Sequence, residues 1–124
     1  MNNQELFLEY VRAYNAKDVD RLLARFDDAC VFESISAGKI AIRARGRSEL
    51  EALARKSADA FASREQKVIT LTGGEGRIVA EIEFRAVLHK DLTPELKAGS
   101  RLDLRGVSVC EIANGKIVRL ADYA

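Results

Sequence analysis

Apolar residues in the first part of the chain recur at every third or fourth position, with charged residues between them. This spacing places the apolar side chains on one face of a helix. The first stripe follows Asn2 and Asn3, either of which can cap a helix that should stop near Ala16. Asp18 can cap a second, shorter helix. The two predicted inner faces are Leu6, Phe7, Tyr10, Val11 and Tyr14, and Val19, Leu22, Leu23 and Phe26.

A third helix is predicted further along, where Ser48 and Glu51 have the spacing of a capping box. Its predicted buried face is Leu50, Leu53, Ala54, Ser57, Ala58 and Phe61. The remaining segments are typical of strands, separated by turns. The expected strands are residues 30–35, 40–45, 67–72, 77–89, 102–112 and 116–123. The last two should form a hairpin through Asn114-Gly115, a pair that tolerates the positive φ of a tight turn.

This order of elements, with helices mostly ahead of strands that follow one another directly, predicts an α+β fold rather than a parallel βαβ sheet. The length of 124 residues fits one domain, residues 1–124, and 48% hydrophobic residues are enough for a core. The 20 basic and 19 acidic residues nearly cancel, which leaves no overall field to attract nucleic acid.

Neither a targeting segment nor a metal site is expected from the sequence. The start of the chain lacks the basic and apolar regions of a signal peptide, and no apolar run is long enough to cross a membrane. We therefore expect a soluble, cytoplasmic protein with no membrane partner. Cys30 and Cys110 lie in apolar, strand-like runs without metal-ligand spacing, so we expect buried free thiols and no metal or other cofactor.

Four short motifs, in this order and spacing, resemble a known superfamily. They are Tyr10-x3-Tyr14-Asn15-Ala16-x-Asp18, Phe26-Asp27-Asp28-Ala29, Arg45-Gly46-Arg47-x-Glu49-Leu50, and Gly115-Lys116-Ile117 followed by Asp122-Tyr123. Together they are similar to the nuclear transport factor 2-like superfamily, which includes ketosteroid isomerase, limonene epoxide hydrolase and the SnoaL-like polyketide cyclases. The resemblance implies a cone of three N-terminal helices on a curved, mostly antiparallel sheet that encloses a deep apolar pocket. It also implies a homodimer paired through the outer sheet face.

The resemblance to ketosteroid isomerase suggests roles for residues near the N-terminus. Glu33 falls where that family keeps its general-base carboxylate, and apolar Val31 and Ile35 on the same side of the strand favour an inward direction. Tyr10 is similar to the tyrosine that donates to the oxyanion there. Tyr14, one turn later, and Phe26 would line the ligand. A solvent-facing Glu33 and core tyrosines are the alternatives.

One departure from that family concerns the second oxyanion donor. A protonated acid should occur within residues 106–109, and the sequence there is Gly-Val-Ser-Val. Without this donor, an enolate loses about 2–4 kcal/mol of stabilisation. The sequence therefore argues against steroid isomerisation itself.

The last strand offers a second group of candidate residues. Asp122 resembles the acid that epoxide hydrolase and the SnoaL-like cyclases place there. His89 and Asp91 form a His-x-Asp where the hydrolase has Arg-x-Asp. Histidine can relay protons near neutral pH, so Asp122, Glu33 and His89 are the catalytic candidates, with Asp91 a ligand contact. Strand alternation places His89 and Asp91 on the polar face with Glu81, so only a β-bulge would turn them inward.

Two classes of function remain open from the sequence. The first is a cofactor-independent isomerase or cyclase acting by acid–base chemistry on a small apolar molecule, with epoxide-hydrolase-like water addition as a variant. The second is a non-catalytic ligand-binding or dimerisation module, because a fold does not determine function. Convergence of Glu33, His89 and Asp122 would favour the enzyme, and a scattered set would favour binding.

Overall fold

The computed structural model describes residues 1–124 as three helices and a six-stranded sheet. All the predicted helices and strands are present, although several begin or end at other residues. The elements are α1 (Asn3–Asn15), α2 (Val19–Leu23), β1 (Phe26–Ser36), β2 (Lys39–Arg45), α3 (Gly46–Ala60), β3 (Phe61–Gly73), β4 (Arg77–Leu88), β5 (Arg101–Ala113) and β6 (Lys116–Tyr123).

The first two helices begin as the sequence predicts. The Asn2 side chain accepts a hydrogen bond from the Glu5 backbone N–H, and Asp18 accepts one from the Arg21 N–H. Each side chain satisfies a backbone donor that the first turn of a helix leaves free. The Asp18 cap lies at the corner between α1 and α2.

The predicted start of α3 is wrong. The helix begins at Gly46, and Ser48 lies inside it rather than at its cap. Glu49 reaches back instead, and its Oε1 accepts a 2.9 Å hydrogen bond from the Arg45 N–H. The helix also ends before Phe61, which is the first residue of β3 rather than part of the helical face.

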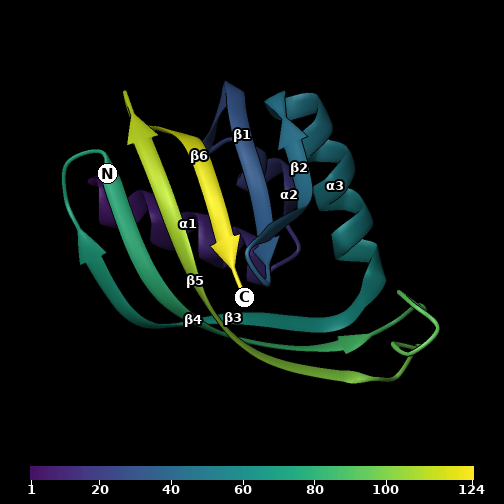
Figure 1. Ribbon diagram of the computed structural model, residues 1–124. Coiled ribbons are helices and arrows are strands. Elements are labelled where there is room, and N and C mark those ends of the chain that lie inside the picture. Colours follow the sequence, from purple (N-terminus) through teal and green to yellow (C-terminus); the bar gives the residue numbers. More distant parts are fainter.

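The sheet has the order β2-β1-β6-β5-β4-β3. All neighbouring strands are antiparallel except β1 and β6, which are parallel. The β5–β6 turn has positive φ at both Asn114 and Gly115, as predicted. Figure 1 shows β3, β4 and β5 bending so that their far ends run beneath α3. Three helices on a curved, mostly antiparallel sheet confirm the predicted α+β fold.

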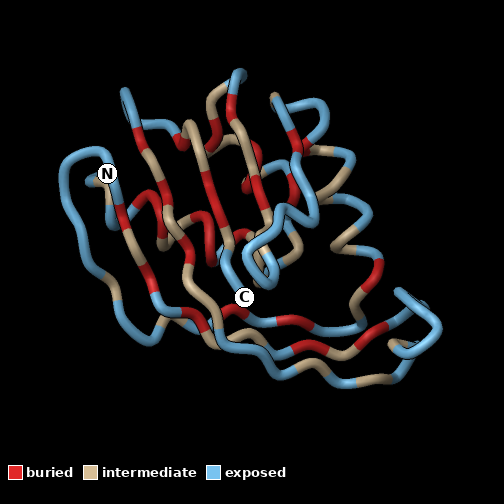
Figure 2. Tube along the Cα trace, in the orientation of Figure 1, coloured by how far each residue is buried: buried red, intermediate tan, exposed pale blue.

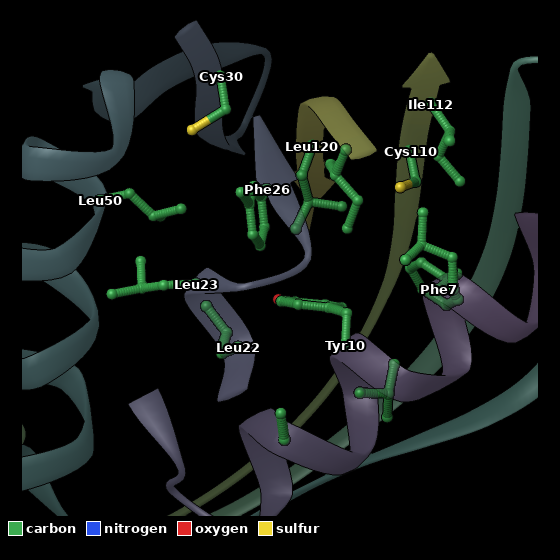
Figure 3. Close-up of a cluster of buried hydrophobic side chains, with 14 of the residues drawn as sticks. Phe7, Tyr10, Leu22, Leu23, Phe26, Cys30, Leu50, Cys110, Ile112 and Leu120 are labelled. Atoms are coloured by element: carbon green, nitrogen blue, oxygen red, sulfur yellow. The ribbon is translucent and has the colours of Figure 1, made fainter. Parts of the chain in front are cut away.

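The core lies between the concave side of this sheet and the helices. Phe7 of α1, Phe26 of β1 and Leu120 of β6 are almost completely buried, and their contacts join the first helix to the centre of the sheet. In Figure 3, Tyr10 extends from α1 toward Phe26, and their ring centroids are 5.7 Å apart. The β4–β5 loop at the far end of the sheet is almost entirely exposed (Figure 2).

Two further features bear on the expectations from sequence. Both cysteines, Cys30 and Cys110, are free and buried, which confirms that part of the prediction. None of the three helices combines the length and the apolar character needed to span a membrane.

Candidate functional site

A cavity of about 470 Å³ lies between the helices and the concave face of the sheet. Most of its wall is hydrophobic, with aromatic rings from α1, β1, β3 and β4. Four large hydrophobic side chains of the lining are also exposed to solvent, which marks where the cavity opens: Ile42, Leu92, Leu104 and Tyr123. An apolar cavity with a few polar groups is the usual form of a small-molecule site.

The carboxylic acid of this cavity is Asp122, next to the last residue of β6. Ser108 on β5 is its direct backbone partner, and the Ser108 Oγ donates a 2.7 Å hydrogen bond to Asp122 Oδ1. Burial against the apolar wall raises the pKa of Asp122 to about 6, although the bond from Ser108 acts in the opposite direction. The carboxyl group therefore gains and loses its proton near neutral pH.

The strand beside Asp122 must approach it closely, and Gly106 makes this possible. A Cβ on Gly106 would lie 2.4 Å from the Tyr123 carbonyl oxygen of β6, closer than atoms can pack. Gly106 also lines the cavity. A larger residue there would force β5 and β6 apart and disturb the pairing that joins Ser108 to Asp122.

Two tyrosines of α1 line the cavity one helical turn apart, with ring centroids 6.3 Å apart. Burial raises the pKa of both Tyr10 and Tyr14, and the charge of Asp122 adds to each increase. Both phenols therefore keep their protons and can serve as hydrogen-bond donors. Phe26 lines the same cavity beside Tyr10.

Arg64 of β3 brings a positive charge to the cavity wall. Its guanidinium carbon lies 3.7 Å from the centre of the Tyr14 ring, and its Nε and Nη2 donate to the Tyr14 carbonyl at 3.2 and 3.0 Å. Nη1 donates a 2.8 Å bond to Ser57 Oγ of α3. These contacts fix Arg64 between the end of α1 and the last turn of α3.

Gln66, two residues further along β3, also lines the cavity. Its backbone is held by Asn15 at the end of α1, which accepts from the Gln66 N–H at 2.8 Å and donates to the Gln66 carbonyl at 3.0 Å. The Gln66 side chain lowers the pKa of Tyr10 and Tyr14 and so partly offsets the increase that burial causes.

Glu33 lies outside the cavity, contrary to the inward direction expected from sequence. Its neighbours Phe32 and Ser34 line the cavity, so strand alternation directs Glu33 to the outer face. There its carboxylate accepts hydrogen bonds from Arg43 at 2.9 and 3.1 Å and from Arg119 at 3.0 and 3.3 Å. The bonds from Arg43, the largest cause, and those from Arg119 lower the pKa of Glu33.

His89 and Asp91 also lie outside the cavity lining. β4 ends at Leu88 and pairs with β5 without a register shift, so no bulge turns His89 inward. His89 is exposed, and its backbone N–H donates to the Ala60 carbonyl at 2.7 Å. Asp91 is exposed in the following loop, where its Oδ1 accepts a 2.8 Å bond from the Ala98 N–H. Glu33, His89 and Asp122 therefore do not converge.

The sequence reasoning missed the polar residues that accompany Asp122 and the tyrosines, namely Ser108, Arg64 and Gln66. The available signal was a polar residue on an otherwise buried strand face. Ser108 alternates with Cys110 and Ile112, which are buried, and Arg64 and Gln66 are buried on the same face of β3. Searching each predicted inner face for such exceptions would have found Ser108, but not Arg64 and Gln66, because β3 begins at Phe61, before the expected strand 67–72.

No three His, Cys, Asp or Glu side chains come together in an arrangement that could hold a metal ion. The donors on the cavity wall are instead hydroxyl, amide and guanidinium groups around one carboxyl group. Such a set can orient a polar organic ligand and exchange a proton with it.

One comparison with known proteins shows a family, and another shows a shared fold. A family model described as a SnoaL-like domain matches residues 7–120. No curated protein matches the sequence. The chain is similar in structure to a candidate polyketide cyclase from Xanthomonas campestris pv. campestris, with a TM-score of 0.83 and 22% identity, covering 98% of this chain and 88% of the other.

Two further solved structures extend the comparison. An epoxide hydrolase from M. tuberculosis, described as LEH-like, gives a TM-score of 0.76 at 19% identity over 96% of this chain and 79% of the other. A protein with a ketosteroid isomerase-like fold from Catenulispora acidiphila, in complex with trimethylamine, gives a TM-score of 0.78 at 9% identity. The match covers 97% of this chain and 85% of the other. At these identities the likeness shows a shared fold.

Proposed function

Because the chain belongs to the SnoaL-like domain family, we propose that it is a cofactor-independent isomerase- or cyclase-type enzyme. Its substrate is a small, largely apolar organic molecule that enters the cavity. The observation that carries this proposal is Asp122, a carboxyl group on an apolar cavity wall with its pKa raised to about 6. A base whose pKa lies near the working pH is largely deprotonated there and still has enough affinity for a proton to remove one from the substrate.

In this mechanism Asp122 takes a proton from a carbon next to a carbonyl group. Ser108 donates a hydrogen bond to Oδ1 of Asp122, and no protein donor contacts Oδ2. Oδ2 is therefore the oxygen that receives the proton. Tyr10 and Tyr14 keep their protons and can donate to the carbonyl oxygen as it gains negative charge. Return of the proton to another carbon gives isomerisation, and carbon–carbon bond formation before its return gives cyclisation.

A second candidate is a ligand-binding module without catalysis. The separation of Glu33, His89 and Asp122 favours it, because a binding cavity needs only an apolar wall and a few polar anchors. Water addition of the epoxide-hydrolase type has less support, since His89 and Asp91 do not line the cavity that contains Asp122.

The two candidates differ in their effect on 5-nitrobenzisoxazole. Removal of its ring C–H proton by a carboxylate breaks the N–O bond, and both electrons of that bond leave with oxygen as a coloured cyanophenolate. The wild-type protein should accelerate this reaction above pH 6, and Asp122→Asn should reduce the acceleration by about 100-fold or more. His89→Ala is the control and should react like wild type.

An equal rate for Asp122→Asn and wild type would remove Asp122 from the mechanism. If neither protein accelerates the reaction, while 2-naphthoate or 2-naphthamide binds in the cavity, the binding module becomes the better description. Folding of each variant is checked by thermal unfolding, so a lost rate is not confused with a lost structure.

The proposal includes a cytoplasmic homodimer paired through the outer sheet face. On that face Val79, Val109 and Ala121 are neighbours across β4, β5 and β6, beside the Glu33 ion pairs. Light scattering should give a mass of about 27 kDa, twice the 13.7 kDa of one chain. A mass of one chain at micromolar concentration would contradict the dimer.

A further inference from the structure

Arg64 is a buried cation without a carboxylate partner. Only 7% of its surface is exposed, and it is the one arginine among the buried residues. Most of the other arginines form ion pairs with carboxylates, but no carboxylate oxygen lies within 4.0 Å of the Arg64 guanidinium. Burial of an unpaired charge is costly, so such a residue is usually matched by an anion.

The hydrogen bonds of Arg64 leave part of its guanidinium unused. This group has five N–H donors. Nε and Nη2 each donate to the Tyr14 carbonyl, and Nη1 donates to Ser57. Two N–H groups therefore remain without a protein acceptor, and Arg64 lies on the cavity wall. Because Tyr14 and Ser57 hold the group in place, the free donors are already oriented before a ligand arrives.

We propose that Arg64 binds a carboxylate of the ligand, so that the substrates of this cavity are apolar molecules carrying an acidic group. The inference rests on the proposed use of the cavity for a ligand, but it does not require Asp122 to be catalytic. A planar guanidinium matches a carboxylate in shape and charge, and such charge-assisted hydrogen bonds are stronger than neutral ones.

Asp122 does not supply the missing anion. The increase in its pKa arises from burial and is offset only by Ser108, with no contribution from Arg64. The pKa of Tyr14, in contrast, is affected by both charges, since Arg64 lowers it and Asp122 raises it. Tyr14 is therefore close to both charges, and because Arg64, Tyr14 and Asp122 line the same cavity, a ligand anchored at Arg64 shares the cavity with Asp122.

The other charged residues of the cavity agree with an anionic ligand. Lys56 and Arg105 line the cavity and are exposed, and because Arg105 is paired with Glu83 at 3.5 Å, Lys56 supplies the unpaired positive charge near its opening. Against these three basic residues the cavity has a single acid, Asp122. A cationic ligand would meet repulsion on entry, whereas a carboxylate is attracted.

Two matched probes test this inference by calorimetry at pH 7.5. 2-Naphthoate carries the carboxylate, and 2-naphthamide has nearly the same shape without the charge. Wild type should bind 2-naphthoate more tightly by about tenfold or more. Arg64→Met should lose this preference while still binding 2-naphthamide. Arg101→Met removes the same charge at an exposed position outside the cavity and should keep the preference.

The wild-type protein provides a measurement that does not depend on a variant folding. The Arg64 Nε–Hε NMR signal should shift with 2-naphthoate and stay in place with 2-naphthamide. Asp122→Asn should keep the preference for 2-naphthoate, so loss of proton transfer and loss of carboxylate binding are separate results. Equal affinity of wild type for the two probes, or a preference that survives in Arg64→Met, would overturn the inference.

Discussion

Ser108 Oγ lies 2.7 Å from Asp122 Oδ1, and the two residues face each other directly in the antiparallel β5–β6 pair. The contact fixes one carboxyl oxygen and leaves the other without a protein donor. Two opposing effects then determine the pKa of Asp122. Burial raises it, the hydrogen bond lowers it, and burial is the larger effect.

Removal of the Ser108 hydroxyl should raise the pKa of Asp122 further. Ser108→Ala takes away a donor that stabilises the ionised carboxylate, and a net hydrogen bond of about 1 kcal/mol corresponds to about 0.7 pH unit. The midpoint of the pH–rate profile with 5-nitrobenzisoxazole should move upward by that amount. Ser57→Ala, another cavity serine that contacts Arg64 instead, should leave the midpoint in place. A midpoint that falls in Ser108→Ala would contradict this explanation.

The raised pKa of Asp122 also predicts a dependence of stability on pH. Between its ordinary value of 3.8 and about 6, the folded protein binds more protons at this site than the unfolded chain does. The contribution of Asp122 to the free energy of unfolding is therefore fully present below pH 3.8 and is lost as the pH rises through 6.

Asparagine does not titrate, so Asp122→Asn isolates this contribution. Urea unfolding of the two proteins should show the wild-type free energy of unfolding, relative to the variant, falling by about 2 kcal/mol between pH 4 and pH 7. Glu9 and Glu33, whose pKa values are lowered by arginine partners, are present in both proteins. Their contributions to the pH dependence of stability therefore cancel in the difference. A difference that stays constant or grows with pH would show that the carboxyl group is not buried.

Glu33 should contribute to stability rather than to proton transfer. Its side chain is only 11% exposed and joins Arg43 of β2 to Arg119 of β6, across three strands. Glu33→Gln should lower the midpoint of thermal unfolding by a few degrees, because it removes a charge from between two arginines.

The same variant should remove the proton of 5-nitrobenzisoxazole at the wild-type rate. Glu51→Gln is the matched control, since Glu51 forms an exposed ion pair with Arg55 within α3 and should hardly change the unfolding midpoint. If Glu33→Gln loses the reaction and keeps its thermal stability, Glu33 has the catalytic role that its sequence position first suggested.

Local patterns along the chain were sufficient to predict most of the fold. Asn2 and Asp18 cap the helices as expected, because capping depends on residues only three positions apart. Asn114-Gly115 adopts the expected turn for the same reason. The predicted cap at Ser48 was wrong because Glu49, rather than Glu51, accepts a hydrogen bond from a free backbone N–H at the start of the helix, that of Arg45.

The direction of strand side chains was harder to predict, because apolar residues on both faces of β1 leave alternation ambiguous. The apolar Val31 and Ile35 favour an inward Glu33, but Cys30 and Phe32 form the inner face and are equally apolar. Strand β4 was clearer, since only its even-numbered residues form a continuous apolar face, and His89 stays outside it. The arginines that hold Glu33 are 10 and 86 residues away, so their pairing depends on the tertiary structure.

The direct test of Asp122 as the acid–base group is an NMR pH titration of its side-chain carboxyl carbon, assigned by comparison with Asp122→Asn. The structure predicts a midpoint near pH 6, because burial raises the pKa of this group to that value. A midpoint near 4, the ordinary value for aspartate, would mean that water solvates the carboxyl group. That result would contradict proton transfer by a desolvated Asp122.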